Sequence, residues 1–420
     1  MQVYKFGGAS VKDAESVKNV KDIIFNHATD QLIVVVSAMG KTTNLLEDIL
    51  NAHSKSDKKA FKFLYQKLSD FHLEILNELF ENKTHVIYSE ISDIIEKIFK
   101  FGNDTLPENY DYAYDQVVSL GELISSKIIH AYISLYSDDV SWIDVRKLVR
   151  TDNYYRSAEV NWDKSTELIQ NYIQKNQTSK IFVTQGFVGH TPEGFTTTLG
   201  REGSDYTAGI FAYCLNATGV TIWKDVPGML NADPKLFNDT VKLNKISFKE
   251  AIELSYFGAS VIHPKTVKPL QNKEIPLYIK SFIEPEKDGT IIQQSTDYDE
   301  NIPSFIIKQN QILLSITPKD FSFIVEQNMS EIFNKIALVG AKVNVMQNSA
   351  LSFSICLDLN SGQLEQLLNL LKKDFIVKYN DGLELVTIRH YNQETINRLT
   401  QGKQVFLEQR TRQTVRLLLK

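Results

Sequence analysis

A polar stretch near the middle of the chain combines residue types that can hold a substrate anion. It covers residues 196–208, reads TTTLGREGSDYTA, and contains Arg201 between two glycines. Glycine lets the backbone approach a ligand, the start of a helix exposes N–H groups, and a guanidinium can bind a carboxylate or phosphate through two bonds. Ser204 and Asp205 open an apolar run, so the stretch predicts a strand, a loop and a helix. Alone, it is equally consistent with a tight turn and a helix cap at Ser204 or Asp205.

Two loops nearer the N-terminus have the same strand–loop–helix character. The first strand carries Lys5 and ends in a Gly-Gly pair, and the second, Leu32–Val36, runs into SAMGKTTN at 37–44. The second loop is not a P-loop, because that motif needs a glycine where the chain has Val35. The Gly-Gly pair lacks the third glycine of a dinucleotide fingerprint. The two corners predict a doubly wound sheet that binds its ligand at the carboxyl ends of its strands.

Three other stretches admit both a structural and a functional interpretation. Ser119 and Glu122 have the spacing of a capping box, and the alternative is that the Glu122 carboxylate binds a substrate ammonium; from this stretch alone we favour the cap. Residues 224–235 combine lysines and acids with proline and glycine, which fits a surface loop or a lid over phosphates. His263 has no nucleophile beside it, so a structural role is favoured.

Composition limits the classes of protein that remain. The chain has 420 residues, room for two or three domains, and a formal net charge of −5, which argues against a general nucleic-acid or membrane-surface role. The longest aliphatic run is far shorter than the ~20 residues of a membrane span. Two cysteines far apart, in no metal-ligand spacing, suit a reducing compartment, and no signal peptide is visible. We expect a cytoplasmic protein.

The remaining segments predict an α/β chain of two parts. Further strands are expected at 141–145, 180–183, 220–223 and 277–279, and helices fill most of 53–115. We expect residues 1–285 to form a three-layer domain with a mostly parallel sheet, and residues 286–303 to form a linker. In residues 304–420 the order strand–helix–strand–strand–helix–strand is followed by a shorter strand–helix–strand–strand repeat. This predicts two ferredoxin-like modules, the second truncated, that share a sheet.

Five motifs together resemble those of aspartate kinase. The resemblance implies an amino-acid kinase fold followed by ACT regulatory modules. The motifs are KFGGAS at 5–10, SLGEL at 119–123, TTTLGREGSD at 196–205, DVPG at 225–228 and HP at 263–264. The resemblance implies that the chain phosphorylates the β-carboxylate of L-aspartate with ATP and Mg²⁺, the first step toward lysine, threonine and methionine. It also implies a homodimer formed through the ACT-like modules, and it replaces the cap interpretation of Glu122 by a substrate-binding one.

The resemblance assigns roles to individual residues. The catalytic pair is Lys5 and Asp205. The residues expected to bind aspartate are Thr43, Glu122, Arg201 and Ser204. The residues expected to contact the nucleotide are Lys5, Gly7, Gly8, Ser37, Lys224, Asp225, Leu230 and Lys235. No side chain is assigned as a metal ligand.

Several positions depart from the family pattern. Glu202 stands where glycine is frequent, Lys224 where threonine is common, and Ser260 where a lysine often faces the nucleotide. Two rival functions share part of the pattern: another amino-acid-family kinase (of glutamate, acetylglutamate or uridylate), and a catalytically dead amino-acid sensor. The ACT-like tail and the retained charged residues disfavour both. Because no second nucleotide domain follows, we expect a monofunctional enzyme.

The ACT-like region also differs from lysine-sensitive relatives. Its loop from Thr317 to Asn328 contains no glycine, and Asn344 and Ala350 stand where acidic residues are common. Without those carboxylates, the charge of a bound lysine would be poorly paired. We therefore expect weak or no inhibition by lysine, whereas threonine needs fewer charges for its recognition.

Overall fold

A computed structural model describes residues 1–103, 105–259, 262–300, 302–320 and 322–420. By its internal contacts the chain divides into two compact units. The first unit comprises Met1–Leu230, Lys242–Tyr256 and Ser260–Asp299, and the second comprises Asn231–Val241, Phe257–Ala259 and Glu300–Lys420.

The described part of the first unit is built on an eight-stranded sheet with the order β3-β4-β2-β1-β7-β9-β10-β8. Neighbouring strands are parallel except β9 and β10. The strands are β1 Gln2–Phe6, β2 Leu32–Val36, β3 Val140–Ile143, β4 Ile181–Gln185, β7 Gly219–Lys224, β8 Lys245–Ser247, β9 Leu277–Ser281 and β10 Thr290–Gln293. Every residue of β2 is buried, as expected of an apolar run covered on both faces.

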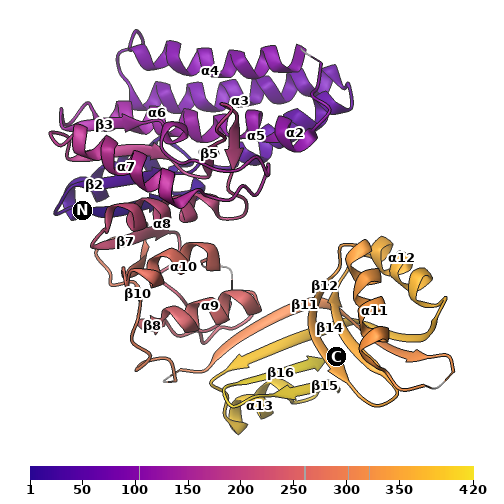
Figure 1. Cartoon of the computed structure of the whole chain (residues 1–420). Helices are drawn as coiled ribbons and strands as arrows, with labels where there is room; N and C mark the ends of the chain where they lie inside the picture. Colours follow the sequence, from indigo (N-terminus) through magenta and orange to yellow (C-terminus); the bar gives the residue numbers. More distant parts are fainter. Residues whose placement is uncertain (104, 260–261, 301, 321) are drawn as a thin grey trace. The chain divides into compact units, whose positions relative to one another are not determined.

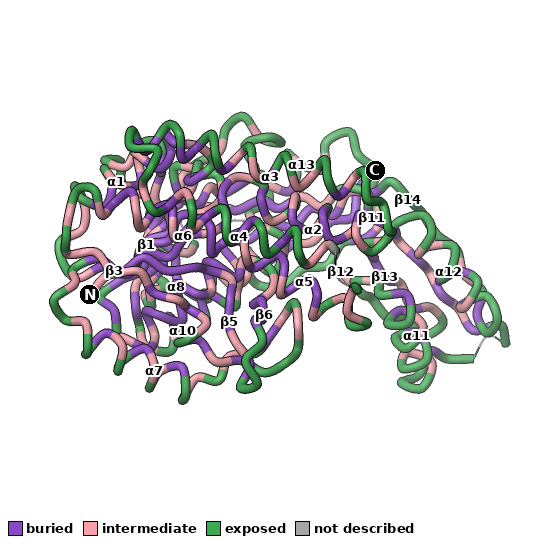
Figure 2. Tube along the Cα trace, turned by 90° about the horizontal axis from the view of Figure 1, so that it is seen from above, coloured by how far each residue is buried: buried purple, intermediate pink, exposed green. Residues whose placement is uncertain are grey.

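Helices cover both faces of this sheet (Figures 1 and 2). Side chains of α1, α3, α4 and α6 pack in one core with those of β1, β2 and β4. Helix α8 contacts β1, β2 and β7, and α7 and α10 pack on α8. The helices are α1 Ala14–His27, α2 Thr42–Ser54, α3 Lys58–Leu79, α4 Val86–Asn103, α5 Tyr110–Val118, α6 Leu120–Ile133, α7 Trp162–Lys175, α8 Gly203–Leu215, α9 Phe248–Phe257 and α10 Pro264–Asn272. The expected three-layer α/β fold with a mostly parallel sheet is confirmed.

One expectation for this unit is wrong in part. Residues 286–303 were expected to form a linker, but they contain β10, which pairs antiparallel with β9 and parallel with β8. The strand has four residues, of which Thr290 and Ile292 are buried. An alternation of four residues inside a polar segment is too short to predict a strand. Pairing with β8 and β9 makes this segment a strand.

The second unit, where described, holds a six-stranded antiparallel sheet with the order β12-β13-β11-β14-β16-β15. Its elements are β11 Ser304–Pro318, α11 Glu326–Leu338, β12 Lys342–Asn348, β13 Phe353–Asp358, α12 Ser361–Leu371, β14 Phe375–Arg389, α13 Gln393–Thr400, β15 Val405–Arg410 and β16 Thr414–Leu419. The predicted strand–helix order and the shared sheet are confirmed. Strand β14 is continuous through Gly382, whose φ is +62°, so the last strand of the first predicted module and the first strand of the second form one strand.

Candidate active site

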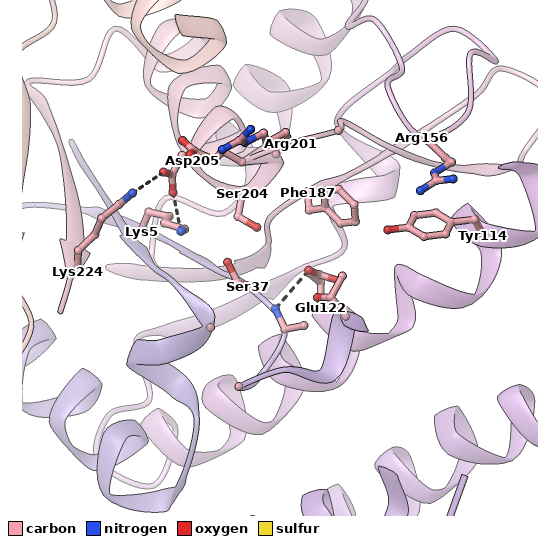
Figure 3. A pocket seen from close by; sticks show the side chains of 17 residues that line it. Lys5, Ser37, Tyr114, Glu122, Arg156, Phe187, Arg201, Ser204, Asp205 and Lys224 are labelled. Carbon is pink, nitrogen blue, oxygen red and sulfur yellow. Dashed lines mark hydrogen bonds and ion pairs between the residues drawn. The ribbon is translucent and has the colours of Figure 1, made fainter. Parts of the chain in front are cut away.

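The first unit contains a cavity of about 490 Å³ at the carboxyl ends of β1, β2 and β7 and the start of α8 (Figure 3). A parallel sheet places its ligand at this edge because the loops after its strands meet there. The residues that line the cavity are Lys5, Gly8, Ser37, Ala38, Gly40, Thr43, Tyr114, Glu122, Arg156, Phe187, Gly200, Arg201, Glu202, Gly203, Ser204, Asp205 and Lys224.

One buried carboxylate joins the two lysines of this cavity. Asp205 is 2% exposed; its Oδ1 lies 2.5 Å from Lys5 Nζ and its Oδ2 lies 3.4 Å from Lys224 Nζ. Burial works to raise the pKa of Asp205, but the ammonium groups of Lys5 and Lys224 outweigh it and hold that pKa below its ordinary value. Asp205 is therefore an ionised anchor that fixes two positive charges at one wall of the cavity.

Glu122 is a second buried acid, and its environment differs. It is 3% exposed, Oε1 accepts a 3.3 Å hydrogen bond from the Ala38 N–H, and Oε2 is buried with no hydrogen-bond partner. Burial raises the pKa of Glu122 to about 8. An oxygen left without a donor at the wall of a cavity is costly unless a ligand supplies one. The arrangement suits the binding of a cation such as an ammonium.

The capping interpretations of the sequence are wrong at both helices. Ser119 precedes α6, but its backbone is helical and its side chain makes no capping hydrogen bond. Helix α8 begins after Glu202, whose backbone is in the left-handed conformation and whose side chain makes no capping hydrogen bond. Ser204 and Asp205 therefore lie inside the first turn. Their side chains face the cavity instead.

Three residues of the cavity have a strained backbone. Arg156, Phe187 and Glu202 line it, and all three have positive φ angles of 65°, 69° and 54°. Non-glycine residues adopt this conformation at a cost of about 1–3 kcal/mol, and such residues cluster at functional sites. The surrounding structure thus holds these three residues in place against a local preference.

A buried carboxylate outside the cavity organises one side of it. Asp115 is fully buried and accepts hydrogen bonds from the Thr198 N–H at 2.8 Å and the Thr198 hydroxyl at 2.7 Å. It also accepts the backbone N–H of Arg156 at 3.0 Å. Thr198 ends the short strand β6 Thr196–Thr198, which pairs with β5 Val188–His190 and leads to Arg201. Asp115 therefore links, by hydrogen bonds, the loop that contains Arg156 to the strand that precedes Arg201.

The cavity brings together most, but not all, of the residues predicted from the sequence. Those that line it are Lys5, Gly8, Ser37, Thr43, Glu122, Arg201, Ser204, Asp205 and Lys224. Gly8 is required because a Cβ there would lie 2.8 Å from the Gly40 carbonyl oxygen, where two loops meet.

Four predicted nucleotide contacts do not line this cavity: Gly7, Asp225, Leu230 and Lys235. Gly7 lies against the site, since a Cβ there would be 3.3 Å from Lys5 Nζ. Leu230 forms an isolated bridge with Lys242, and Lys235 belongs to the second unit. Position 260 lies outside the described residues.

Sequence reasoning missed Tyr114, Arg156 and Phe187. They belong to no motif and lie far apart in the chain, so only the fold brings them together. Across the described ranges, no group of three or more His, Cys, Asp or Glu side chains is placed to hold a metal ion. No helix in those ranges is both long and apolar enough to cross a membrane.

Comparisons with known proteins identify the family of the chain. Residues 1–281 match the amino acid kinase family. Lysine-sensitive aspartokinase 3 of Escherichia coli (strain K12) is 31% identical over 85% of this chain and 78% of that protein. Aspartokinase of Chlamydia pneumoniae is 30% identical over 92% and 84%.

Longer relatives and solved structures extend the comparison. The chloroplastic bifunctional aspartokinase/homoserine dehydrogenase 2 of Arabidopsis thaliana is 29% identical over 89% of this chain but only 42% of its own length. The crystal structure of E. coli aspartokinase III in complex with aspartate and ADP superposes with a TM-score of 0.83 at 27% identity, and covers 100% of this chain and 96% of that one.

Proposed function

The chain belongs to the amino acid kinase family, as an aspartokinase, and we propose from that premise how its cavity transfers a phosphoryl group from ATP to the β-carboxylate of L-aspartate. The product is 4-phospho-L-aspartate, the first intermediate toward lysine, threonine and methionine. The observation that supports the residue roles is the lysine–aspartate–lysine cluster at one wall of the cavity, with an unpaired buried Glu122 oxygen in the same cavity.

The cavity holds aspartate through the charged groups of the substrate. The Glu122 carboxylate binds the α-ammonium, which supplies the donor that Oε2 lacks. Arg201 binds a carboxylate of the substrate, and the hydroxyls of Thr43 and Ser204 add hydrogen bonds. Binding the ammonium favours the ionised form of Glu122, so substrate lowers the pKa that burial has raised.

The chemical step needs charge neutralisation more than proton transfer. A carboxylate with an ordinary pKa near ~3.9 is already ionised at pH 7, so it attacks phosphorus without a general base. The obstacle is the repulsion between that carboxylate and the triphosphate, and phosphoryl transfer is catalysed mainly by positioning and charge stabilisation. Lys5 stabilises the transferring phosphoryl group, Asp205 positions Lys5, and Lys224 contributes a second cation.

The nucleotide is held by the loops around these lysines. Gly7, Gly8 and Ser37 follow β1 and β2, where backbone N–H groups approach the phosphates, and Asp225 and Leu230 belong to the segment after β7. Lys235, in the second unit, is assigned to the nucleotide by the motif resemblance alone. A magnesium ion bound with ATP would supply further charge neutralisation at the phosphates. Mg²⁺ commonly uses one or two carboxylates plus phosphate oxygens. Glu202 fits that description and would help to hold the ion, because it lines the cavity and one of its oxygens is buried without a hydrogen-bond partner. Asp205 is already paired with Lys5 and Lys224 and keeps its positioning role.

We extend the proposal to the assembly and location of the enzyme. The second unit holds two chains together as a homodimer, and the enzyme works in the cytoplasm without a nucleic-acid or membrane partner. The division of labour between residues 1–285 and 304–420, catalysis in the first and regulation or dimerisation in the second, belongs to the same proposal.

An assay with trapped product tests the function. The purified chain is incubated with ATP, Mg²⁺ and hydroxylamine, with aspartate, glutamate, N-acetylglutamate or UMP as acceptor. Hydroxamate formation with aspartate, and ADP release dependent on it, is the expected result. Turnover with another acceptor alone would identify a different amino-acid-family kinase. No turnover with any acceptor, together with binding of an amino acid, would identify a sensor.

A further inference from the structure

A second arginine lines the cavity, and no motif identified it. The Arg156 guanidinium lies 4.2 Å from the centroid of the Tyr114 ring. Figure 3 shows this pair on the side of the cavity opposite Lys224, with the Tyr114 hydroxyl directed toward Glu122 and Phe187. An arginine stacked on an aromatic ring keeps its planar N–H groups in a defined orientation.

The backbone of Arg156 is held in place independently of its side chain. Its N–H donates to both oxygens of the buried Asp115, at 3.0 and 3.2 Å, and its φ is +65°. A residue with a Cβ disfavours this conformation, so its retention at the wall of a ligand cavity points to a role for the side chain. The same Asp115 carboxylate fixes Thr198, which precedes Arg201 by three residues.

The present partners of the Arg156 guanidinium are weak competitors for a ligand. Its ion pairs with Glu47 and Asp111 are long, at 3.6 and 3.5 Å, and the side chain is 42% exposed. Exposed pairs of this kind contribute little. A carboxylate entering the cavity can therefore replace them and gain two parallel N–H bonds from one guanidinium.

The chemistry of aspartate selects the group that Arg156 meets. The α-ammonium and the α-carboxylate are attached to the same carbon, so the carboxylate lies close to Glu122 once Glu122 holds the ammonium. The β-carboxylate must face Lys5 and the phosphates. Tyr114 is close enough to Glu122 for the two groups to influence each other electrostatically, and burial keeps the Tyr114 hydroxyl protonated by raising its pKa to about 12. The α-carboxylate is thus directed to the side of the cavity that Tyr114 and Arg156 form.

We propose that Arg156, stacked on Tyr114, binds the α-carboxylate of aspartate together with Arg201 and makes the enzyme select substrates with a free α-carboxylate. This role rests on the proposed aspartate kinase function and adds a specificity-determining residue to it.

The test compares aspartate with L-isoasparagine, in which the α-carboxylate is an amide and the β-carboxylate is intact. The variant is Arg156→Gly, because glycine adopts φ of +65° without strain and leaves the backbone bond to Asp115 available. We expect the KM for aspartate to rise about 10- to 100-fold, the range for loss of hydrogen bonds to a charged group. The KM for ATP and the kcat/KM for isoasparagine should stay within about twofold, so discrimination between the two acceptors collapses.

Two control variants separate substrate binding from general damage. Glu47→Gln removes one ion-pair partner of Arg156 and should leave the KM for aspartate unchanged or lower, because the guanidinium becomes more available. Arg146→Ala removes an arginine that pairs with Asp144 outside the cavity and should have no effect. An unchanged KM for aspartate in Arg156→Gly, or equal losses with both acceptors, would overturn the proposal. A wild-type protein inactive on aspartate would instead contradict the proposed function.

Discussion

Asp205 is one buried carboxylate shared between two ammonium groups, and in the proposed mechanism this sharing decides how the nucleotide end of the cavity responds to substrate. Before ATP binds, the negative charge of Asp205 keeps Lys5 and Lys224 together. When a triphosphate enters, both lysines gain a stronger partner, while Asp205 still orients Lys5. Preorganised charge of this kind accounts for much of the rate enhancement in phosphoryl transfer.

Replacing Lys5 tests this arrangement. We expect Lys5→Ala to lower kcat by about 10² or more, because loss of one preorganised stabilising group commonly costs ~2.7–4 kcal/mol in the transition state. Steady-state kinetics on protein shown to be folded by circular dichroism measure the effect. Lys18→Ala, which removes an exposed lysine paired with Glu15 on α1, is the control. A folded Lys5→Ala protein with near-normal turnover would show that Lys5 is not catalytic.

The raised pKa of Glu122 predicts a pH dependence for substrate capture. In the free protein the carboxyl is protonated below about pH 8 and ionised above it. Only the ionised form attracts the aspartate ammonium, so kcat/KM for aspartate should rise as pH increases through about 8, since this parameter reports groups of the free enzyme. In Glu122→Gln the rise should be absent and kcat/KM low throughout. The same rise in both proteins would assign it to another group.

The same carboxyl predicts an opposite trend in stability. Its pKa is about 8 in the folded chain and near its ordinary value of 4.5 when unfolded, so the folded state binds the proton more tightly. Its contribution to stability is present below pH 4.5 and is lost as pH rises through 8. Glu122→Gln should match wild type near pH 5 and exceed its free energy of unfolding at pH 9 by about 1 kcal/mol or more. Urea unfolding at both pH values measures this, with the exposed-site variant Glu15→Gln as control.

At the scale of elements, the start of α8 is held in the cavity by a close approach of backbone to backbone. A Cβ on Gly186, which follows β4, would lie 2.5 Å from the Ser204 Cβ and 2.7 Å from its Cα. The Phe187 N–H next to it donates to the Thr207 hydroxyl at 2.9 Å. The glycine therefore sets the position of the first turn of α8, which carries Ser204 and Asp205.

Gly186→Ala should move that turn without removing any group that acts on substrate. Displacements of about 1 Å are enough to cost ~10² in rate, so we expect kcat/KM to fall at least about tenfold while the protein stays folded. Gly362→Ala in α12 is the matched control, because the nearest atom to its Cβ is Asn360 Oδ1 at an ordinary 3.5 Å. Equal activity of the two variants would mean that α8 tolerates the extra methyl group by a harmless shift.

At the scale of the whole molecule, we propose that the second unit governs the response of the enzyme to amino acids. Asn344 in β12 is buried; its Oδ1 accepts from Lys308 Nζ at 2.9 Å, its Nδ2 donates to Gln311 at 2.7 Å, and its carbonyl accepts from Arg416 at 2.5 Å. The surroundings of this position are therefore cationic. A ligand with a positive side chain would be repelled there instead of paired.

We predict weak or no inhibition by lysine, although the first unit and the fold resemble those of a lysine-sensitive relative. Lysine and threonine are titrated separately and together, at aspartate near its KM, with the E. coli enzyme as a positive control. Inhibition by submillimolar lysine would show that a functional lysine site exists despite Asn344 and Ala350. Light scattering in the same buffers measures whether effectors change the molar mass expected of a dimer of 47.9 kDa chains.

Local sequence determined the features that depend on neighbours along the chain. The apolar run Leu32–Val36 became a central strand, glycine loops followed β1 and β2, and the arginine–serine–aspartate stretch opened a helix, because these outcomes follow from side-chain periodicity and backbone freedom. The repeated strand–helix order of the C-terminal region could be predicted from the same side-chain periodicity. The resemblance of the motifs to aspartate kinase, and not this local pattern, assigned their charged residues to one site before any distance was known.

The tertiary structure alone decided which side chains share an environment. Glu122 had the spacing of a cap, and only its burial beside Ala38 turned it into an unpaired acid with a raised pKa. Tyr114 and Arg156 carry no sequence signal, yet the hydrogen bonds of Asp115, which follows Tyr114 in α5, bring the Arg156 backbone to the same wall of the cavity. Burial and long-range hydrogen bonding depend on the packing of segments distant in the chain. No local sequence pattern encodes burial or long-range hydrogen bonding, so only the tertiary structure could identify Tyr114 and Arg156.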